Sequence, residues 1–450
     1  MSILFTKQDD ELKPQPAHIG NQRIGASLFL TENFFKTSHK WLNNCFSFTL
    51  TKCCLFAEHT DDELQSKVLM TEMLSKKPIW FPVNVRSEKS HSTAYYSVQP
   101  LVNMNNFYTF LSGTRQTRIK TTAVDLLTAR SSNADFKVSI PHIVYDYSEK
   151  TIAFQEIPIL QGNFYVANSY DMAVVEINYS LKKQKRLKLA NFIQTKITFN
   201  RGTTWSKIIA PLHDMDGKPF KCILEMPCTL HLHIGSSSQY PSLYSHHSAP
   251  GIILAIGNVG PYLSHKREEL STFLSSDAGL TWRQIHKEVC VYEFGNKGGI
   301  ILLAKHQRKT KQAVYSYDNG RSWKTLDFMF KSEDIYVTNI ALEPTKNSLE
   351  FLIIGRDKYA SKPGSKGYTV SVDFSKYHLE NCKGFEEAGS ESSDYEKFVP
   401  HTYKHSRCFM GRTGYFIRKK PERKCVSPDF NQSFVEENKC LCTHDDWECD

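Results

Sequence analysis

The 450-residue sequence has no apolar run that approaches the ~20 residues needed to cross a bilayer. Its N-terminus also lacks the basic-then-apolar layout of a secretory signal peptide. Helical 3.6-residue periodicity is rare, whereas short, glycine-bounded apolar runs such as Gly251–Ile256 and Gly298–Ala304 are typical of strands. These absences argue against a helical membrane bundle and favour an all-β chain.

The sequence contains no motif for binding RNA or DNA, although its net charge is +9. Positive charge is concentrated in three separated runs, 182–188, 305–311 and 418–424, which we interpret as solvated loops. His231 and His233 share one strand face, with His246 and His247 nearby, but a metal site would need a third ligand of defined geometry, which the sequence does not supply. We therefore predict no nucleic-acid partner, no metal site and no cofactor.

Six of the twelve cysteines lie between Cys382 and Cys449, where the strand pattern is lost. Dense, irregularly spaced cysteines in a loop-rich tail are typical of a small module that is cross-linked by disulfides in an oxidising compartment. Cys440, Cys442 and Cys449 are alternative zinc ligands, but the paired knuckles of structural zinc sites are absent. A disulfide-rich tail without a signal sequence suggests a fragment of a longer protein.

One octapeptide pattern, Ser-x-Asp-x-Gly-x-(Thr/Ser)-Trp, occurs twice between residues 275 and 323 and once upstream in a related form. In a tight hairpin the Asp accepts from backbone N–H groups and the Gly takes a positive φ. The hydroxyl groups close the loop, and the Trp buries its ring between sheets. We interpret these residues as structural: Thr198, Asn200, Gly202, Thr204 and Trp205; Ser275, Asp277, Gly279, Thr281 and Trp282; Ser316, Asp318, Gly320, Ser322 and Trp323.

Degenerate copies of this turn begin near residues 31, 71 and 128. In the first of them, Asn33 occupies the Asp position and Phe35 the Gly position. The spacing of all six copies fits one four-stranded sheet per turn, as in the blades of a β-propeller. We predict an unstructured lead-in over residues 1–21, β-propeller blades over 22–376 and a small cysteine-rich module over 377–450.

The repeated turn is the Asp-box, which resembles the blade turns of sialidases and of sortilin-type receptors. The resemblance to the sortilin family is continuous from about residue 195 to 450 and includes the Thr229–His233 strand, Ala249-Pro-Gly251 and the tail Asp445-Asp-Trp-Glu-Cys449. It looks closest to the sortilin-related receptor branch. The resemblance implies a ten-bladed vacuolar protein sorting receptor domain and a ten-cysteine module. This chain has room for about six of those blades and for the start of the module.

The resemblance implies a sorting-receptor ectodomain that binds peptide or proprotein ligands in a central tunnel, without catalysis. The intact receptor would be a membrane protein of the Golgi, endosomes and cell surface, with cytosolic adaptors binding a tail absent here; a homodimer is also compatible. The family pattern further implies disulfides and, on the lumenal side, glycosylated sequons. The residues concerned are Cys222–Cys228, Cys382–Cys425, Cys408–Cys440, Asn178 and Asn431.

The family also implies a basic residue that pairs with the C-terminal carboxylate of a bound peptide, and Lys67 stands at the matching place after Leu55-Phe-Ala57. The family uses Arg there; Lys keeps the charge but loses the bidentate fork. A one-residue shift would place Ser66 at the site and remove the charge. An equally good interpretation is that Lys67 is a solvent-facing residue at the start of a strand, without a role in ligand binding.

Two other classes of protein share the propeller signature. An Asp-box glycoside hydrolase of the sialidase kind would need an arginine cluster, a Tyr nucleophile and an acidic partner. Its usual Arg-Ile-Pro start motif is absent, as is the G-x-S-x-G motif of serine hydrolases. A propeller scaffold without a ligand is the second alternative, and only a binding test separates it from a receptor. We predict that the chain is not an enzyme.

Overall fold

The computed structural model describes twenty-two segments of the chain. They are residues 3–7, 26–33, 35–50, 54–60, 66–72, 78–86, 94–103, 108–117, 120–130, 135–145, 164–166, 173–180, 191–199, 202, 204–220, 228–234, 240–329, 334–359, 364–377, 380–399, 412–428 and 435–441. Within these segments the regular structure is β-strand, with three short 3₁₀ helices and no α-helix. The 3₁₀ helices are η1 (Arg267–Glu269), η2 (Asn296–Gly298) and η3 (Ser375–Tyr377). The prediction of an all-β chain is confirmed.

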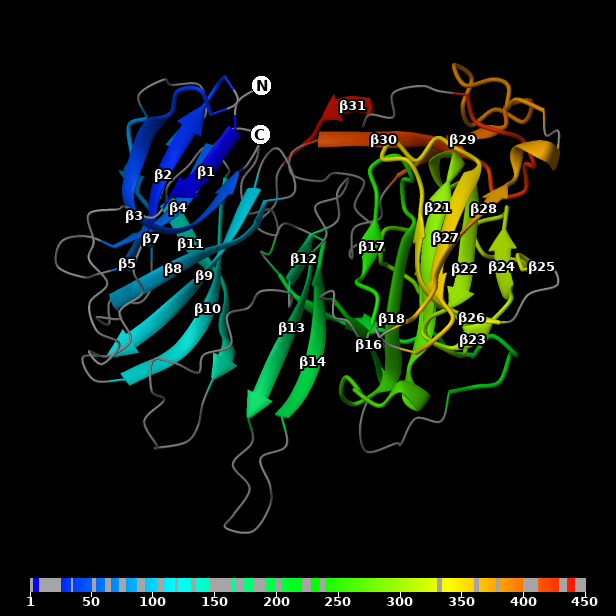
Figure 1. The fold of residues 1–450 in the computed structure, drawn as a ribbon, viewed down its shortest axis with the longest axis horizontal. Coiled ribbons are helices and arrows are strands. Elements are labelled where there is room, and N and C mark those ends of the chain that lie inside the picture. The colour runs from blue at the N-terminus through cyan, green and yellow to red at the C-terminus, as the bar shows by residue number, and fades with distance from the viewer. Residues whose placement is uncertain are drawn as a thin grey trace, which may run out of the picture. The chain divides into compact units, whose positions relative to one another are not determined.

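The chain divides into two compact units, one of residues 1–166 with 176–193 and one of residues 167–175 with 194–450 (Figure 1). The first unit holds β1 (Ile3–Lys7), β2 (Ala26–Thr31), β3 (His39–Leu50), β4 (Cys54–Thr60), β5 (Ser66–Glu72), β6 (Phe81–Pro82), β7 (Asn84–Arg86), β8 (Ala94–Asn103), β9 (Tyr108–Thr117), β10 (Lys120–Arg130), β11 (Asp135–Tyr145), β12 (Phe164–Val166) and most of β13 (Ala173–Ser180). Strands β1 to β6 form one antiparallel meander, and β8 to β11 form another.

The start of the chain differs from the sequence-based expectation. β1 pairs antiparallel with β2, from Ile3 opposite Thr31 to Lys7 opposite Ser27, so this part of the lead-in is ordered as a strand. Apolar residues of high β propensity at an open sheet edge gain backbone partners there. As a result, β1 to β6 form a six-stranded sheet where the repeat spacing predicted four strands. The division between blades and cysteine-rich module at residues 376 and 377 stays a prediction.

The second unit holds the rest of the strands. They are most of β14 (Asn191–Thr198), β15 (Ser206–Ile209), β16 (Thr229–His233), β17 (Tyr244–Ser245), β18 (Ile253–Gly260), β19 (Ser271–Ser275), β20 (Arg283–His286), β21 (Cys290–Gly295), β22 (Ile300–Lys305), β23 (Lys309–Thr310), β24 (Gln312–Ser316), β25 (Lys324–Asp327), β26 (Ile335–Ala341), β27 (Glu350–Arg356), β28 (Gly367–Asp373), β29 (Tyr395–Phe398), β30 (Arg412–Lys419) and β31 (Val435–Lys439).

Three successive antiparallel four-stranded arrangements make up the centre of this unit. Their strand orders are β16-β18-β19-β20, β21-β22-β24-β25 and β23-β26-β27-β28. The last two are separate sheets, whereas the first is part of a longer sheet that continues from β16 into β15. In the first two, each strand pairs with the next one along the chain once the two-residue strands β17 and β23 are set aside, as in the blades of a propeller. We call these arrangements the first, second and third blades.

The blades pack face to face because their inner strands are apolar on both sides. Ile301 and Leu303 of β22 pack with Leu254, Leu274 and other side chains of the first blade. The alternate residues Ile300, Leu302 and Ala304 pack instead with residues of the third blade such as Val337 and Phe351. Successive side chains of a strand point to opposite faces, so a continuous apolar run indicates a sheet that is covered on both faces. This stacking agrees with the predicted β-propeller class.

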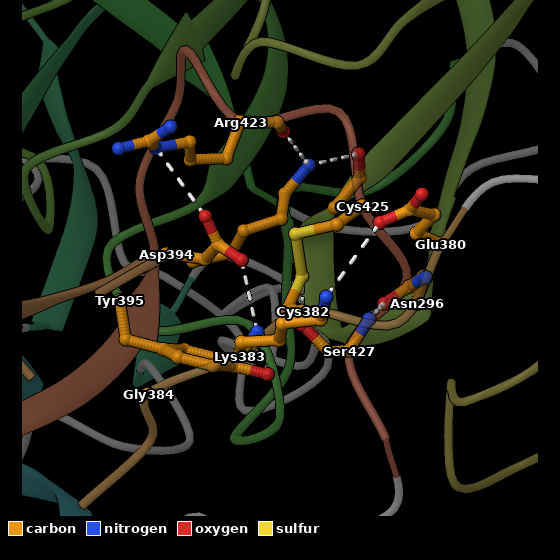
Figure 2. Close-up of a disulfide and its surroundings, with 12 residues drawn as sticks. Asn296, Glu380, Cys382, Lys383, Gly384, Asp394, Tyr395, Arg423, Cys425 and Ser427 are labelled. Carbon is orange, nitrogen blue, oxygen red and sulfur yellow. Dashed lines mark hydrogen bonds and ion pairs between the residues drawn. A yellow bond between two sulfur atoms is a disulfide. The ribbon is translucent and has the colours of Figure 1, made fainter. Parts of the chain in front are cut away.

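The cysteine-rich tail folds onto the blades. β29, β30 and β31 form a three-stranded sheet, and Cys382 is joined to Cys425 (S–S 1.99 Å), as predicted. Figure 2 shows Ser427, next to this disulfide, donating its backbone N–H to Oδ1 of Asn296 in η2 (2.8 Å). Asn296 has a positive φ of 46°, and this left-handed turn presents its side chain to the tail.

Two basic residues of β30 hold the tail against the blades. Arg418 donates to the carbonyl oxygens of Pro250 (3.1 Å) and Ser276 (2.7 Å), and its guanidinium lies 3.9 Å from the ring centroid of Phe398. Lys419 is 7% exposed and donates to the carbonyl oxygens of three residues, Gly299, Tyr317 and Arg423. The interpretation of 418–424 as a solvated loop is therefore wrong for its first two residues, because β30 carries them into the contact.

Gly251→Ala tests this contact. Gly251 has a φ of +86°, and an added Cβ would lie 2.5 Å from Nη1 of Arg418 and 2.8 Å from the carbonyl oxygen of Ser276. Gly217 has a similar φ of +77°, but its Cβ would meet nothing within 4 Å. In denaturant unfolding, Gly251→Ala should cost about 1–3 kcal/mol more than Gly217→Ala, the usual range for overpacking. Equal losses would mean that the close approach is absent.

Candidate ligand-binding site

The Asp-box at residues 275–282 forms a closed network of hydrogen bonds. Oγ of Ser275 donates to Oδ1 of Asp277 (2.8 Å) and accepts the backbone N–H of Gly279 (2.8 Å). Oδ1 of Asp277 also accepts the backbone N–H of Thr281 (2.9 Å). Nε1 of Trp282 donates to the carbonyl oxygen of Gly279 (2.9 Å), and its ring is 3% exposed. The carboxylate and the indole therefore bind their own turn, between β19 and β20.

The Asp-box at residues 316–323 repeats this geometry between β24 and β25. Ser316 donates to Asp318 (2.7 Å) and accepts from Gly320 (2.9 Å), and Asp318 accepts the backbone N–H of Ser322 (2.9 Å). Although burial raises the pKa of Asp318, the hydrogen bonds from Ser322 and Ser316 outweigh that effect and leave the pKa below its ordinary value. The carboxylate is therefore held ionised inside its turn.

The second blade's Asp-box also contacts the first blade. A Cβ on Gly320, whose φ is +74°, would collide with Cδ2 of Leu274 and lie 3.8 Å from Cγ2 of Ile285. Trp323 packs against the apolar cluster that these two residues belong to. The Gly of this turn thus serves both the backbone conformation and the close approach of two sheets.

The upstream Asp-box retains part of the network. Oγ1 of Thr198 accepts the N–H of Gly202 (3.0 Å), and Nε1 of Trp205 donates to the carbonyl oxygen of Gly202 (3.1 Å). Asn200 lies outside the described residues, and Thr204 is exposed.

The degenerate Asp-box between β2 and β3, which begins at Thr31, forms the hydrogen bonds expected of an Asp-box. Oδ1 of Asn33 accepts the N–H of Thr37 (2.8 Å), and Oγ1 of Thr31 accepts the N–H of Phe35 (3.0 Å). Phe35 has a φ of +66° at the place of Gly. An Asn side chain supplies the same acceptor oxygen as an Asp, which explains why the turn tolerates the replacement of its Asp.

The predicted carboxylate-binding residue, Lys67, is the second residue of β5 and is exposed. It lies opposite His59 in the β4–β5 hairpin, and Ser66 lies opposite Thr60. Leu55, Phe56 and Ala57 of β4 are fully buried, so the strand before Lys67 is anchored in the core. Lys67 therefore lies at the turn end of the β4–β5 hairpin, with its side chain exposed.

The histidines of β16 are buried and bind backbone groups. Nε2 of His231 lies 3.1 Å from the carbonyl oxygen of Gly260, and Nε2 of His233 lies 2.9 Å from that of Ser264. Burial lowers the pKa of each to about 4. Among the described residues, no cluster of His, Cys, Asp and Glu has the arrangement that holds a metal ion.

The other predicted disulfides and glycosylation sites are only partly within the described residues. Cys228 and Cys440 are each disulfide-bonded, while Cys222 and Cys408, their predicted partners, lie outside those residues. Asn178 is in β13, and Asn431 lies outside the described residues. In the described part of the chain, no helix has the length and apolar character of a bilayer span.

The family comparisons cover almost the whole chain. The family model described as "Sortilin, neurotensin receptor 3" matches residues 3–340, and its C-terminal counterpart matches residues 342–450. The vacuolar protein sorting/targeting protein PEP1 of Saccharomyces cerevisiae is 34% identical over 334 residues, which is 72% of this chain. The vacuolar protein sorting/targeting protein 10 of Talaromyces stipitatus is 27% identical over 96% of this chain. The chain spans 20% and 28% of the length of these two relatives.

The similarity of the chain to solved structures is weaker than its similarity to the family models. A polysaccharide lyase that acts as an ulvan lyase matches 79% of this chain and 90% of its own length, with 11% sequence identity and a TM-score of 0.30. A likeness at this level carries no argument about the activity of the chain.

Trp282→Ala should lower the free energy of unfolding by about 3–5 kcal/mol, the usual cost of emptying a buried aromatic site. Denaturant unfolding followed by circular dichroism measures the change. The control is Leu212→Ala, since Leu212 is 80% exposed in the same unit. That variant should change stability by less than about 0.5 kcal/mol, and an equally small effect at Trp282 would show that its ring is not packed.

Acid should destabilise the second unit through its buried histidines. The folded-state pKa values of His231 and His233, about 4, lie below the ordinary value of 6.5, so the unfolded chain binds more protons between these limits. Their stabilising effect is present above pH 6.5 and is lost as the pH falls toward 4, on the order of 1 kcal/mol each by about pH 5.5.

Thermal unfolding at a series of pH values measures this effect. His233→Gln keeps a donor for the carbonyl oxygen of Ser264 and should flatten the dependence on pH. The same change at the exposed His213 should leave the dependence intact. Parallel curves for His233→Gln and the unmodified chain would contradict the assignment.

Proposed function

The chain belongs to the sortilin family, and we propose that it is the ligand-binding, non-catalytic part of a vacuolar protein sorting receptor. The observation that carries this proposal is the match of the two sortilin family models to residues 3–340 and 342–450. The relatives named for vacuolar sorting add support, since one of them aligns over 96% of the chain. By the family pattern, the intact protein is a membrane receptor of the Golgi, endosomes and cell surface, and cytosolic adaptors bind its tail. The assignment to the sortilin-related receptor branch stays a prediction.

The Asp-box carboxylates of the first and second blades do not form a catalytic pair. The carboxylate of Asp277 is bound to Ser275 and Thr281, and that of Asp318 is bound to Ser316 and Ser322. These carboxylates are used by their turns, whereas a glycosidase needs a pair of carboxyl groups facing a substrate. A propeller scaffold without ligands remains the alternative that binding measurements decide.

We infer that the ligand is a peptide or proprotein segment that ends in a free carboxylate near Lys67. The exposed position of Lys67 at the start of β5 supports this assignment, because an ammonium group there can meet an anionic chain end. Strand-edge pairing and apolar pockets would supply the rest of the binding energy. Cys222–Cys228 and Cys408–Cys440 pairing, glycans on Asn178 and Asn431, and a homodimer belong to the same proposal.

Lys67→Ala should weaken binding of a family-type peptide ligand by about 1.5–3 kcal/mol, the range for a hydrogen bond to a charged group. Amidation of the peptide's C-terminus should cost about as much, and the two changes together should cost little more than either alone. Isothermal titration calorimetry measures the four affinities, which are those of the unmodified chain and of Lys67→Ala for the free and for the amidated peptide.

The matched control is Lys36→Ala, because Lys36 is also an exposed lysine of the first unit. It should leave the affinity unchanged. If Lys67→Ala and amidation are both silent while the peptide still binds, Lys67 is not the carboxylate site. If no peptide binds to the unmodified chain, the scaffold alternative holds.

A further inference from the structure

One end of the second blade carries a concentration of positive side chains that the proposed function does not use. β22 and β24 run antiparallel, and the link between them, from Lys305 to Gln312, lies at the end opposite the Asp-box that follows Ser316. Arg267 of η1 adds a further cation. We call Arg267, Lys305, Arg308, Lys309 and Lys311 the positive surface.

Two hollows open on the positive surface, and both are lined by Lys309. The first, of about 370 Å³, is lined by apolar residues that include Val314 and by Lys305, Lys309 and Lys311. A lining of apolar side chains and ammonium groups gives this hollow an amphipathic character. It suits a ligand that carries an apolar group beside an anion.

The second hollow, of about 420 Å³, has an aromatic wall. Tyr336 and Tyr359 pack edge to face with their ring centroids 5.7 Å apart. The rest of the lining is Arg267, Gln307, Arg308 and Lys309. Tyr359 is 54% exposed. Exposed tyrosine rings beside arginine are typical of surfaces that bind other polypeptides.

The positive charge is only partly balanced. Glu288 pairs with Lys305 (2.7 Å) and with Arg308 (3.2 Å), so one carboxylate serves two cations. Lys309 and Lys311 are exposed, and no described carboxylate lies within ion-pair distance of either. Asp334 is the one acidic side chain among the described residues that line the hollows. Like charges held close together in this way are stabilised by an anionic ligand.

The cations are held on ordered elements. Lys309 lies opposite Tyr336 in the β23–β26 pairing, and Arg267 donates to the carbonyl oxygen of His306. The hydroxyl group of Tyr359 donates to Oε1 of Gln307 (3.4 Å). A surface whose backbone is already ordered loses less conformational entropy when it binds a ligand.

We propose that the positive surface is a second binding site, specific for an acidic peptide segment with aromatic or aliphatic residues between its carboxylates. The carboxylates would pair with Lys309 and Lys311, and the apolar residues would enter the two hollows. This inference goes beyond the proposed function, because the site uses neither Lys67 nor a C-terminal carboxylate. A highly sulfated polysaccharide would satisfy the charges but would leave the apolar lining residues and the tyrosine wall without complementary groups.

The test uses the full 450-residue chain and a short fluorescent peptide of Glu, Asp and Phe with an amidated C-terminus. Fluorescence anisotropy should show binding to the unmodified chain that weakens as salt is raised. Lys309→Glu combined with Lys311→Glu should weaken binding by at least about tenfold, because each charge pair becomes a repulsion. Both residues are exposed, so the variant should unfold at the same temperature as the unmodified chain.

A charge-matched control separates local from overall electrostatics. Lys324→Glu combined with Lys366→Glu changes the net charge equally at two exposed positions of β25 and the loop before β28, and it should leave the affinity unchanged. A peptide with Gln and Asn in place of Glu and Asp should not bind. Lys67→Ala should have no effect on this peptide, so failure of the present proposal and failure of the carboxylate site give different results.

Three results would overturn the proposal. The first is equal affinity of the peptide for the unmodified chain, the Lys309/Lys311 variant and the control variant. The second is equal binding of the neutral peptide. The third is binding of heparin that depends on Lys309 and Lys311 while the acidic peptide does not bind, which would assign the positive surface to sulfated polysaccharides.

Discussion

The second unit depends on the burial of both faces of β22. Ile300 to Ala304 are five successive apolar residues, and a strand turns alternate side chains to opposite faces. One sheet alone cannot shield such a strand from water, so a neighbour is needed on each side. The apolar clusters that join the second blade to the first and to the third meet this need. The Asp-box turns connect the last two strands of the first blade, β19 and β20, and those of the second blade, β24 and β25.

The attachment of the cysteine-rich tail follows from the same stacking. Lys419 enters a region where burial lowers its pKa to about 8, and its ammonium group is tolerated because three carbonyl oxygens accept its hydrogen bonds. Two of these oxygens belong to Gly299 and Tyr317, which lie at the Asp-box end of the second blade. The tail is therefore bound to the blades by polar contacts to their backbone, together with the Arg418 contacts.

The two ends of the second blade have different chemistry. At the Asp-box end the polar groups satisfy one another or bind the tail, and little of their hydrogen-bonding capacity remains for a ligand. At the opposite end, short links carry exposed cations and tyrosines that the fold itself does not require. Function generally depends on such sites and not on the architecture that carries them. The receptor assignment and the proposal for the positive surface thus concern different parts of the fold and do not depend on each other.

The sequence by itself determined the all-β class, the Asp-box turns and the Cys382–Cys425 bridge, because these depend on local periodicity, turn chemistry and a recognisable family pattern. Tertiary structure alone decided the pairing of β1 with β2, the contacts of Arg418 with the blades and the burial of Lys419, since a strand partner and a desolvated cation depend on residues far away in sequence. It also decided that Lys309 stands beside Tyr336 of another strand. A charged run looks the same in a sequence whether it faces water or a neighbouring sheet, and only packing distinguishes the two.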